Sequence, residues 1–399
     1  MRKKIETNYI KIKLALYAIV HFGWECIRNP RSIPRYIKVA NLSLQKGGVQ
    51  KLIDDIFRVY LPKKYLLKTK LHIKEPSTSI FSKIRVHQAG INTCSVQKNV
   101  YKVDANVSIL IIRAGAMGDV LLATPIVKLL HEKYDGLCLI TVATRYPAVF
   151  TNNPYIYKTL SIKELRYLEN NYDVILNLDL CYEKNRFLHI TSAYNFLAFG
   201  AHQNNQFLQP ELFLSNYDEK IVEKWLNDIG GPYIVCHNRI DPSQQYRNVK
   251  PKDWEYLITE LSVKTGLKIL QIGGEELDVA LTNKDLPLID ARGKLSLQQS
   301  KGLIENAALF IGTDAGPLHI AACTKTPIVS FFTIAHHEVR KPLRSPDAIF
   351  TAITPEVSCY GCQNLYPFGS QWECERGDFA CTSKFNIKNA LNACLSIIK

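Results

Sequence analysis

The sequence contains no low-complexity tract, and its N-terminal apolar run is too short to cross a bilayer, which needs about 20 residues. That run, residues 14–24, is interrupted by His21 and Gly23. It follows a basic tetrapeptide, as the core of a secretory signal would, but no small-x-small cleavage site comes after it. We therefore expect an amphipathic helix here, and neither a membrane span nor a cleaved leader.

Acidic residues are scarce in the N-terminal quarter of the chain. Residues 1–105 hold 21 Lys and Arg against 6 Asp and Glu (net +15), whereas the rest holds 29 against 30 (net −1), which gives the total of +14. Such a surface attracts anionic lipid headgroups by about 1 kcal/mol per basic residue. Nucleic acid would reward the same charge, but no nucleic-acid-binding motif accompanies it. We expect a basic, mainly helical extension that docks on an anionic membrane surface. A solvated arm is the alternative, and no nucleic-acid partner is expected.

The rest of the chain alternates strand-like and helix-like segments, which indicates α/β architecture with parallel sheets. Gly230-Gly231-Pro232 breaks the chain where a hinge belongs. We expect one lobe over residues 106–230, a second over 231–385, and a final helix over 386–399 that packs back on the first lobe. Strands are expected at residues 108–112, 137–143, 174–178, 233–236, 267–272, 288–289, 309–311 and 327–332.

In the second lobe, the apolar run at residues 309–311 leads into a glycine turn and a helix. Gly312 and Gly316 allow close backbone approach, and Asp314 is expected to cap the helix that carries His319. Free amides at such a helix start favour phosphate. An ordinary strand-to-helix turn with a capping aspartate is the alternative.

In the first lobe, the run at residues 108–112 leads into a similar turn. Residues 113–120 read Arg-Ala-Gly-Ala-Met-Gly-Asp-Val, and a helix is expected from Asp119 to about residue 134. Two such units, each with an aspartate at the mouth of its turn, predict two doubly wound lobes that face each other. Ligands in these sheets bind at the carboxyl ends of the strands.

Four motifs then occur in an order and spacing typical of one family. They are Ile-Arg-x-x-x-Met-Gly-Asp-Val (112–120) with Thr124-Pro125, Gly-Lys-Leu-Ser-Leu (293–297), Asp-Ala-Gly-Pro-Leu-His (314–319), and Thr326-Pro327. Over residues 106–399 the chain resembles glycosyltransferase family 9, the ADP-heptose:lipopolysaccharide heptosyltransferase family. The resemblance implies a GT-B type fold of two facing Rossmann-like lobes. It also implies inverting transfer of a sugar, heptose from ADP-heptose, to a bacterial surface glycan or glycolipid such as lipopolysaccharide core.

Asp119 is the candidate catalytic residue. Glycosyl transfer needs a base that takes the proton of the acceptor hydroxyl, and the aspartate of this Gly-Asp-Val is the family's proposed base. Its alternative role is to cap its own helix. The chain has no Asp-x-Asp motif, so we expect a metal-independent enzyme without a catalytic cofactor. Fixed amides and cations would then stabilise the leaving diphosphate.

The resemblance also assigns residues to the two sides of the cleft. Arg247 would meet the donor phosphates, and Glu275 or Glu276 would lie near the nucleoside. The alternatives are purely structural roles: Arg247 as a solvated cation, His319 as a core histidine and Asp179 as a helix cap. The other donor-side candidates are Thr313, Asp314, Ala315, Gly316 and His319, and the acceptor-side candidates are Arg113, Gly118 and Asp179.

Two departures from the family pattern border the donor site. The hydroxyl residues that many members place before Met-Gly-Asp are Ala-Gly-Ala (114–116) here. The frequent Phe-Gly-Pro-Thr after the 327–332 strand is replaced by Phe-Thr-Ile-Ala (332–335), followed by His336-His337. Both changes bear on the identity of the sugar more than on the reaction class.

The chain has 11 cysteines, of which seven are scattered, mostly in apolar segments, as reduced buried thiols usually are. The other four are Cys359, Cys362, Cys374 and Cys381, and the Cys-x-x-Cys half has metal-ligand spacing. In the related autotransporter heptosyltransferases, similar cysteines hold a structural iron. We expect a structural iron or zinc here, with free thiols or disulfides as alternatives.

Two other functions suit the same architecture. Nucleotide-sugar 2-epimerases share the fold, and a non-catalytic, nucleotide-binding scaffold of a glycan assembly complex would share it too. The leading interpretation is an enzyme in the cytoplasm, held at the inner face of the bacterial inner membrane.

Overall fold

The computed structural model describes most of the two expected lobes. The basic extension lies outside the described residues, apart from the two-residue strand β1 (Arg85–Val86). Our predictions for that extension therefore stay predictions. The described residues are 85–86, 107–167, 172–183, 188–199, 208–238, 246–247, 249–274, 286–365 and 374–398.

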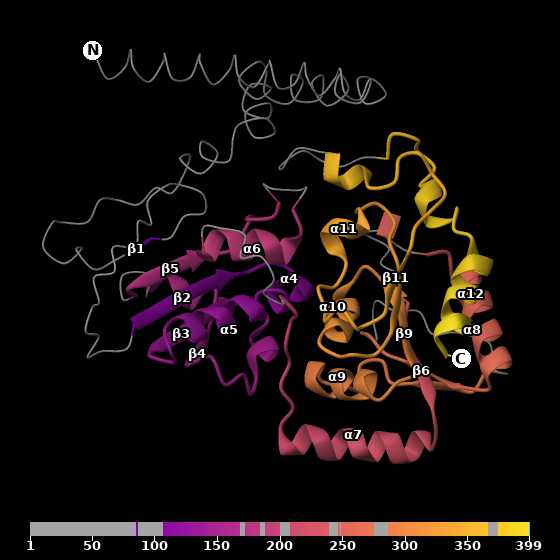
Figure 1. The fold of residues 1–399 in the computed structure, drawn as a ribbon, viewed down its shortest axis with the longest axis horizontal. Helices are drawn as coiled ribbons and strands as arrows, with labels where there is room; N and C mark the ends of the chain where they lie inside the picture. The colour runs from indigo at the N-terminus through magenta and orange to yellow at the C-terminus, as the bar shows by residue number, and fades with distance from the viewer. Residues whose placement is uncertain are drawn as a thin grey trace, which may run out of the picture.

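The first lobe is built on a parallel sheet in the order β1-β5-β2-β3-β4 (Figure 1). Its central strand, β2, pairs with β5 on one edge and β3 on the other, so that Ile109 lies beside both Val174 and Ile140. A strand enclosed in this way needs a continuous apolar run, which β2 has. The other strands of this sheet are β3 (Cys138–Thr144), β4 (Lys158–Ser161) and β5 (Val174–Asn177), beside β2 (Val107–Arg113).

The second lobe contains a parallel sheet of six strands in the order β11-β10-β9-β6-β7-β8. Here β9 is the enclosed strand, between β10 and β6. The two parallel sheets confirm the predicted α/β fold class. The strands are β6 (Tyr233–His237), β7 (Lys268–Gln271), β8 (Leu288–Asp290), β9 (Leu309–Thr313), β10 (Ile328–Phe331) and β11 (Phe350–Ile353).

The single helix expected after Asp119 is divided into α4 (Met117–Leu121) and α5 (Thr124–Lys133). Pro125 lies in the first turn of α5, where its missing N–H costs nothing, and it would have broken a continuous helix. The Thr124 hydroxyl donates to the Leu121 carbonyl at 2.8 Å and so ties the two helices together. The other α-helices among the described residues are α6 (Ile190–Phe199), α7 (Asn216–Ile229), α8 (Pro251–Thr265), α9 (Leu297–Glu305), α10 (Gly316–Ala322), α11 (His337–Arg340) and α12 (Ile387–Ile398).

Helix α7 lies against the second lobe, although we placed the boundary between the lobes at its end, residue 230. Its Asp218 accepts hydrogen bonds from Gln299 (3.1 Å) and Ser296 (3.4 Å) of the adjoining α9 region. Gly302 of α9 leaves room for Val222 of α7. The chain therefore crosses between the lobes before α7 begins, and Figure 1 shows α7 running along the base of the second lobe.

The final helix requires a correction, because α12 packs on its own lobe and not on the first. Ala390, Leu391 and Cys394 are buried in one cluster with Trp254 and Leu257 of α8. In Figure 1, α12 and α8 lie side by side on the face of the second sheet that is turned away from the first lobe. The apolar stripe of α12 was visible in the sequence, but such a stripe does not say which partner covers it.

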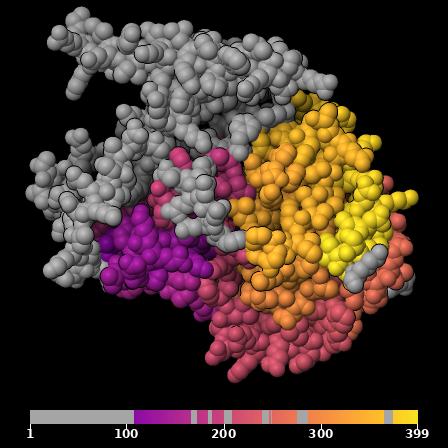
Figure 2. Space-filling view, viewed as in Figure 1, coloured from indigo at the N-terminus to yellow at the C-terminus, as the bar shows by residue number. Residues whose placement is uncertain are grey.

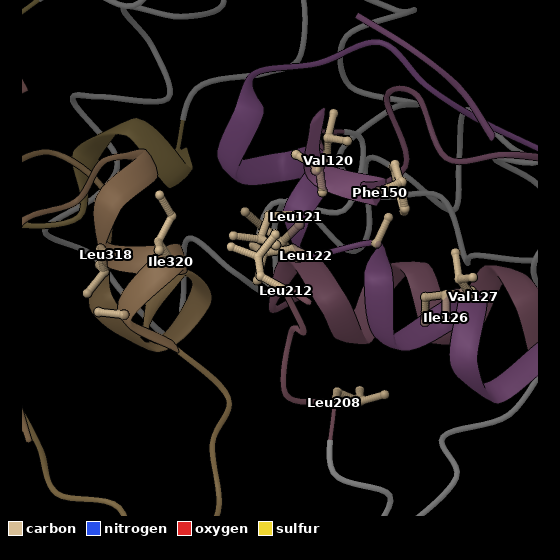
Figure 3. Packing of buried hydrophobic residues seen from close by; sticks show 14 of the residues in the cluster. Val120, Leu121, Leu122, Ile126, Val127, Phe150, Leu208, Leu212, Leu318 and Ile320 are labelled. Carbon is tan, nitrogen blue, oxygen red and sulfur yellow. The ribbon is translucent and has the colours of Figure 1, made fainter. Parts of the chain in front are cut away.

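One hydrophobic cluster spans the two lobes. A single cluster includes Leu121 and Leu122 of α4 and the following turn together with Leu318 and Ile320 of α10, as the close-up in Figure 3 shows. The space-filling view shows the coloured surfaces of the two lobes in direct contact (Figure 2). The shared cluster therefore fixes the two glycine turns against each other.

None of the described helices combines the length and the apolar character that a membrane span requires.

Candidate functional site

The turns that follow β2 and β9 meet face to face between the lobes. Gly118 lies so close to His319 that a Cβ atom at residue 118 would come within 2.6 Å of the imidazole Cδ2. A Cβ atom at Gly316 would likewise overlap the Met117 methyl group. Each turn thus needs a glycine where the other turn presents a side chain. The structure brings together the two units that the sequence singled out.

Asp119 lies at this junction with a side chain that is 13% exposed. Its carboxylate forms an ion pair with Arg113 (Nη2 to Oδ2, 3.1 Å) and accepts from the Tyr182 hydroxyl, which is 3.3 Å from both of its oxygens. It also accepts from the Ala116 amide at 3.3 Å, as a residue in the first turn of a helix can. The Asp119 carboxylate therefore caps the start of α4 and also contacts Arg113 and Tyr182.

Arg113, the last residue of β2, is 1% exposed and is surrounded by carboxylates. Besides Asp119 it pairs with Asp179 (3.2 Å) and Glu183 (3.0 Å), and its guanidinium lies 5.5 Å from the centre of the Tyr194 ring. Burial would lower the pKa of Arg113, but these neighbours raise it above its usual range. Arg113 therefore stays charged and holds the acidic side chains in place.

Asp179 and Glu183 come from the segment that follows β5. Asp179 accepts from the Ala114 amide at 2.8 Å as well as from Arg113, so it joins the ends of β5 and β2. Burial raises the pKa of Glu183, and the charge of Arg113 opposes that change. We predicted Asp179, Arg113 and Gly118 on the acceptor side, and all three lie beside Asp119 in the first lobe.

On the other side of the junction, Asp314 is bound by Arg247. The guanidinium donates to the Asp314 backbone carbonyl and lies 3.3 Å from its Oδ2. Burial would raise the pKa of Asp314, but the charges of Arg247 and Arg340 and the hydrogen bond from Arg247 outweigh it and lower this pKa. Asp314 does not cap α10 as we expected: Ala315 occupies the N-cap position, and no side chain bonds there. The reason is that Arg247 holds the Asp314 carboxylate.

His319 and Thr313 lie beneath the same turn. The His319 side chain is 4% exposed, and burial lowers its pKa, so it is neutral. Within the part of the chain that the structure describes, neither His319 Nδ1 nor the Thr313 hydroxyl has a hydrogen-bond partner. Buried polar atoms are usually satisfied, so these two atoms are exceptions within the described part of the site. Glu275 and Glu276 lie outside the described residues.

Arg340 is a site residue that the sequence reasoning missed. It ends α11, donates a side-chain hydrogen bond to Tyr182, and has its guanidinium 5.1 Å from the centre of the Tyr182 ring. Burial would lower its pKa, but Tyr182, Asp314 and Asp119 raise it above the usual range. Arg340 is thus a cation between the two aspartates, one from each lobe. It follows the unusual His336-His337 by three residues, which was the signal available in the sequence.

The four clustered cysteines lie near one another in the second lobe. Burial, and after it the nearby Cys362, Cys359 and Cys374, raise the pKa of Cys381 to about 12. The structure places none of these four in a disulfide. Among the residues that the structure describes, no group of three or more His, Cys, Asp and Glu is arranged to hold a metal ion. The structural iron or zinc therefore stays a prediction.

The loop that carries Cys359 and Cys362 also supports the donor side. The Tyr360 hydroxyl accepts from the His337 amide at 2.7 Å, and Asn364 accepts from the His336 amide at 2.8 Å. The rings of His336 and His337 stack with their centres 4.7 Å apart. The two histidines that follow the segment replacing the family's Phe-Gly-Pro-Thr are thus fixed by contacts with the cysteine loop.

Fold and site together define a class of protein: two facing parallel α/β lobes of the GT-B type, with polar side chains gathered where the turns meet. Residues 252–367 match the family model described as "Glycosyltransferase family 9 (heptosyltransferase)". Model and fold confirm the resemblance that the sequence motifs predicted. The matched region holds β9, α10 and the whole donor-side turn.

Individual relatives agree with this family. The chain is 41% identical over 56 residues to lipopolysaccharide heptosyltransferase 3 of Escherichia coli (strain K12), a match that covers 14% of this chain and only 16% of that protein. The fold is similar to a glycosyltransferase family 9 structure from Veillonella parvula (TM-score 0.60, 15% identity, 74% of this chain and 98% of that one). It is also similar to the iron-containing glycosyltransferase TibC of enterotoxigenic E. coli (TM-score 0.54, 16% identity, 74% and 77%).

Proposed function

We propose that the protein is an inverting glycosyltransferase that moves a sugar, heptose from ADP-heptose, onto a bacterial surface glycan such as lipopolysaccharide core. The observation that carries this proposal is the pairing of the two turns, which sets Asp119 of one lobe opposite Asp314 and His319 of the other. Asp119 would take the proton of the acceptor hydroxyl. TibC has been solved with ADP-D-β-D-heptose, which supports this choice of donor.

The donor would occupy the second lobe. Arg247 would meet its diphosphate and give up part of its contact with Asp314, because phosphate oxygens compete for the same guanidinium. Asp314 and the neutral His319 would then hydrogen-bond the sugar or the nucleotide. Fixed cations in a site from which water is excluded stabilise a leaving diphosphate, and we propose that no catalytic metal is needed. A structural iron or zinc at the cysteine cluster forms part of the same proposal.

Product analysis tests this function. The full chain should release ADP when it is incubated with ADP-heptose and a lipopolysaccharide-core acceptor. Release from UDP- or GDP-sugars alone would contradict the proposed donor. Isomerisation of the donor without any acceptor would replace transfer by epimerisation.

We further propose that residues 1–105 hold the enzyme on the cytoplasmic face of the membrane, where lipid-linked acceptors lie. The support is their charge of +15, which comes from 21 basic and 6 acidic residues. In flotation with anionic liposomes, the full chain should bind at low salt and be released at high salt, since salt screens the attraction. Equal binding by a chain that begins at residue 106 would contradict this location.

A further inference from the structure

The segment after β5 delivers more than Asp179 to the cleft. Leu180 has a left-handed backbone (φ 60°), a conformation that non-glycine residues rarely adopt. The turn that it makes aims Asp179, Tyr182 and Glu183 at the same guanidinium of Arg113. Strained residues cluster where a fold must place functional groups, which makes this segment a candidate for a role in the chemistry.

Tyr182 holds the candidate base directly. Its hydroxyl lies 3.3 Å from both oxygens of the Asp119 carboxylate. Burial raises the pKa of Tyr182 above its usual range, so the phenol stays protonated and can act as a hydrogen-bond donor. The neighbouring Tyr194 provides a contrast, because its hydroxyl donates to the backbone carbonyl of Asp119, at 3.4 Å.

The other partner of Tyr182 comes from the second lobe. Arg340 of α11 donates a side-chain hydrogen bond to Tyr182, and its guanidinium lies 5.1 Å from the ring centre. Tyr182 thus accepts from Arg340 and donates to Asp119, so the donor-side lobe reaches the base through one hydroxyl group. A hydroxyl group that accepts one hydrogen bond is polarised by it and donates a stronger hydrogen bond in turn.

We propose that Tyr182 is a positioning residue for Asp119, and that Arg340 makes this positioning depend on the contact between the lobes. The inference deepens the proposed glycosyl transfer and rests on it. With the Tyr182 hydroxyl 3.3 Å from both carboxylate oxygens, the remaining lone pairs of Asp119 would receive the proton of the acceptor hydroxyl. The acceptor hydroxyl gives its proton to Asp119 as its oxygen bonds to the sugar. The sugar–phosphate bond breaks, and its electron pair leaves with the diphosphate. Tyr182 keeps its own proton throughout.

Several charged or titratable groups face the Tyr182 hydroxyl and shape any pH dependence. A hydrogen bond to a carboxylate favours its ionised form. Removal of the hydroxyl should therefore move the acid limb of the rate profile to higher pH. The groups that face the Tyr182 hydroxyl are Asp119 of α4, Arg113 of β2, Arg340 of α11, Tyr194 of α6 and Glu183 of the segment after β5.

The test compares Tyr182→Phe with Tyr194→Phe, since both variants keep their rings and lose one hydroxyl. Tyr182→Phe should lower kcat about tenfold, as expected for a lost hydrogen bond to a charged group. It should leave the KM for ADP-heptose within about twofold and raise the acid limb of the pH profile. Tyr194→Phe should leave that limb in place, because its hydroxyl does not touch the carboxylate.

Arg340 supplies the second arm of the test. Arg340→Gln should lower kcat, and the double variant with Tyr182→Phe should lose no more than the larger single loss, because both act through one hydroxyl. Arg340→Lys should recover part of the rate. Equal pH profiles for the two tyrosine variants, or additive losses in the double variant, would overturn this inference while transfer by the wild type stood. A wild type that transfers no sugar would overturn the proposed function, and this inference with it.

Discussion

Gly118→Ala tests whether the two turns touch as the structure has them. The new methyl carbon would lie 2.6 Å from His319 Cδ2, whereas carbon atoms in contact normally lie about 3.5–4.0 Å apart. One turn must therefore retreat by about 1 Å. The His319 ring cannot simply swing into solvent, because its side chain is 4% exposed. Overpacking of this kind costs about 1–3 kcal/mol, which should lower the unfolding midpoint by a few degrees.

The same displacement should affect catalysis more strongly than stability. A shift of about 1 Å between reacting groups can cost on the order of 10²-fold in rate, and Asp119 follows Gly118 directly. Transfer from ADP-heptose and thermal unfolding should be measured on Gly118→Ala and on Gly274→Ala. At Gly274 a Cβ atom would meet nothing within 4 Å, so that control should behave like the wild type.

A second substitution separates the clash from other causes. Adding His319→Ala to Gly118→Ala removes the ring that the methyl group meets, so the two losses of stability should be less than additive. Strictly additive losses, or a Gly118→Ala protein as stable and as active as Gly274→Ala, would refute the proposed contact between the turns.

Three further outcomes follow from the site and its surroundings. Arg247→Ala and Asp314→Ala should each weaken ADP binding measured by calorimetry, by about tenfold or more for the arginine; unchanged affinity in both would remove them from the donor site. Protein purified without added metal should contain close to one iron or zinc per chain, and Cys359→Ser with Cys362→Ser should lose it together with stability; a metal-free, fully stable wild type would contradict the site. Burial lowers the pKa of His189 to about 4, against 6.5 in the unfolded chain. The contribution of the neutral, buried His189 to the free energy of unfolding is therefore complete above pH 6.5. It is lost as the pH falls toward 4, by up to about 3 kcal/mol. Denaturant unfolding of His189→Gln should show a smaller loss over this window, and an unchanged slope would refute the assignment.

The sequence predicted those strands and turns whose residues follow a simple pattern. Enclosed parallel strands such as β2 and β9 need a continuous apolar run, so both could be located within a few residues. The two glycine turns were recognised because the same order of strand, glycine, aspartate and helix occurs twice. That repetition also predicted that the two lobes would face each other.

The parts that the sequence could not predict depend on which surfaces meet. An apolar stripe on α12 demands a partner, but nothing local decides between the first lobe and α8. Asp314 satisfies every local rule for a cap, yet the distant Arg247 binds it instead. Tyr182 and Arg340 are far apart in the chain, so their contact with each other appears only in the folded molecule.

Asp119→Asn tests the central claim most directly. The asparagine keeps the size of the side chain and an oxygen that can accept from Tyr182 and the Ala116 amide, but it cannot take the acceptor proton. Transfer of heptose should slow by about 10²-fold or more, while ADP affinity and the unfolding midpoint should stay close to those of the wild type. An asparagine variant that transfers heptose at the wild-type rate would contradict the account, and a loss of stability or ADP affinity in place of the loss of rate would make Asp119 a capping residue.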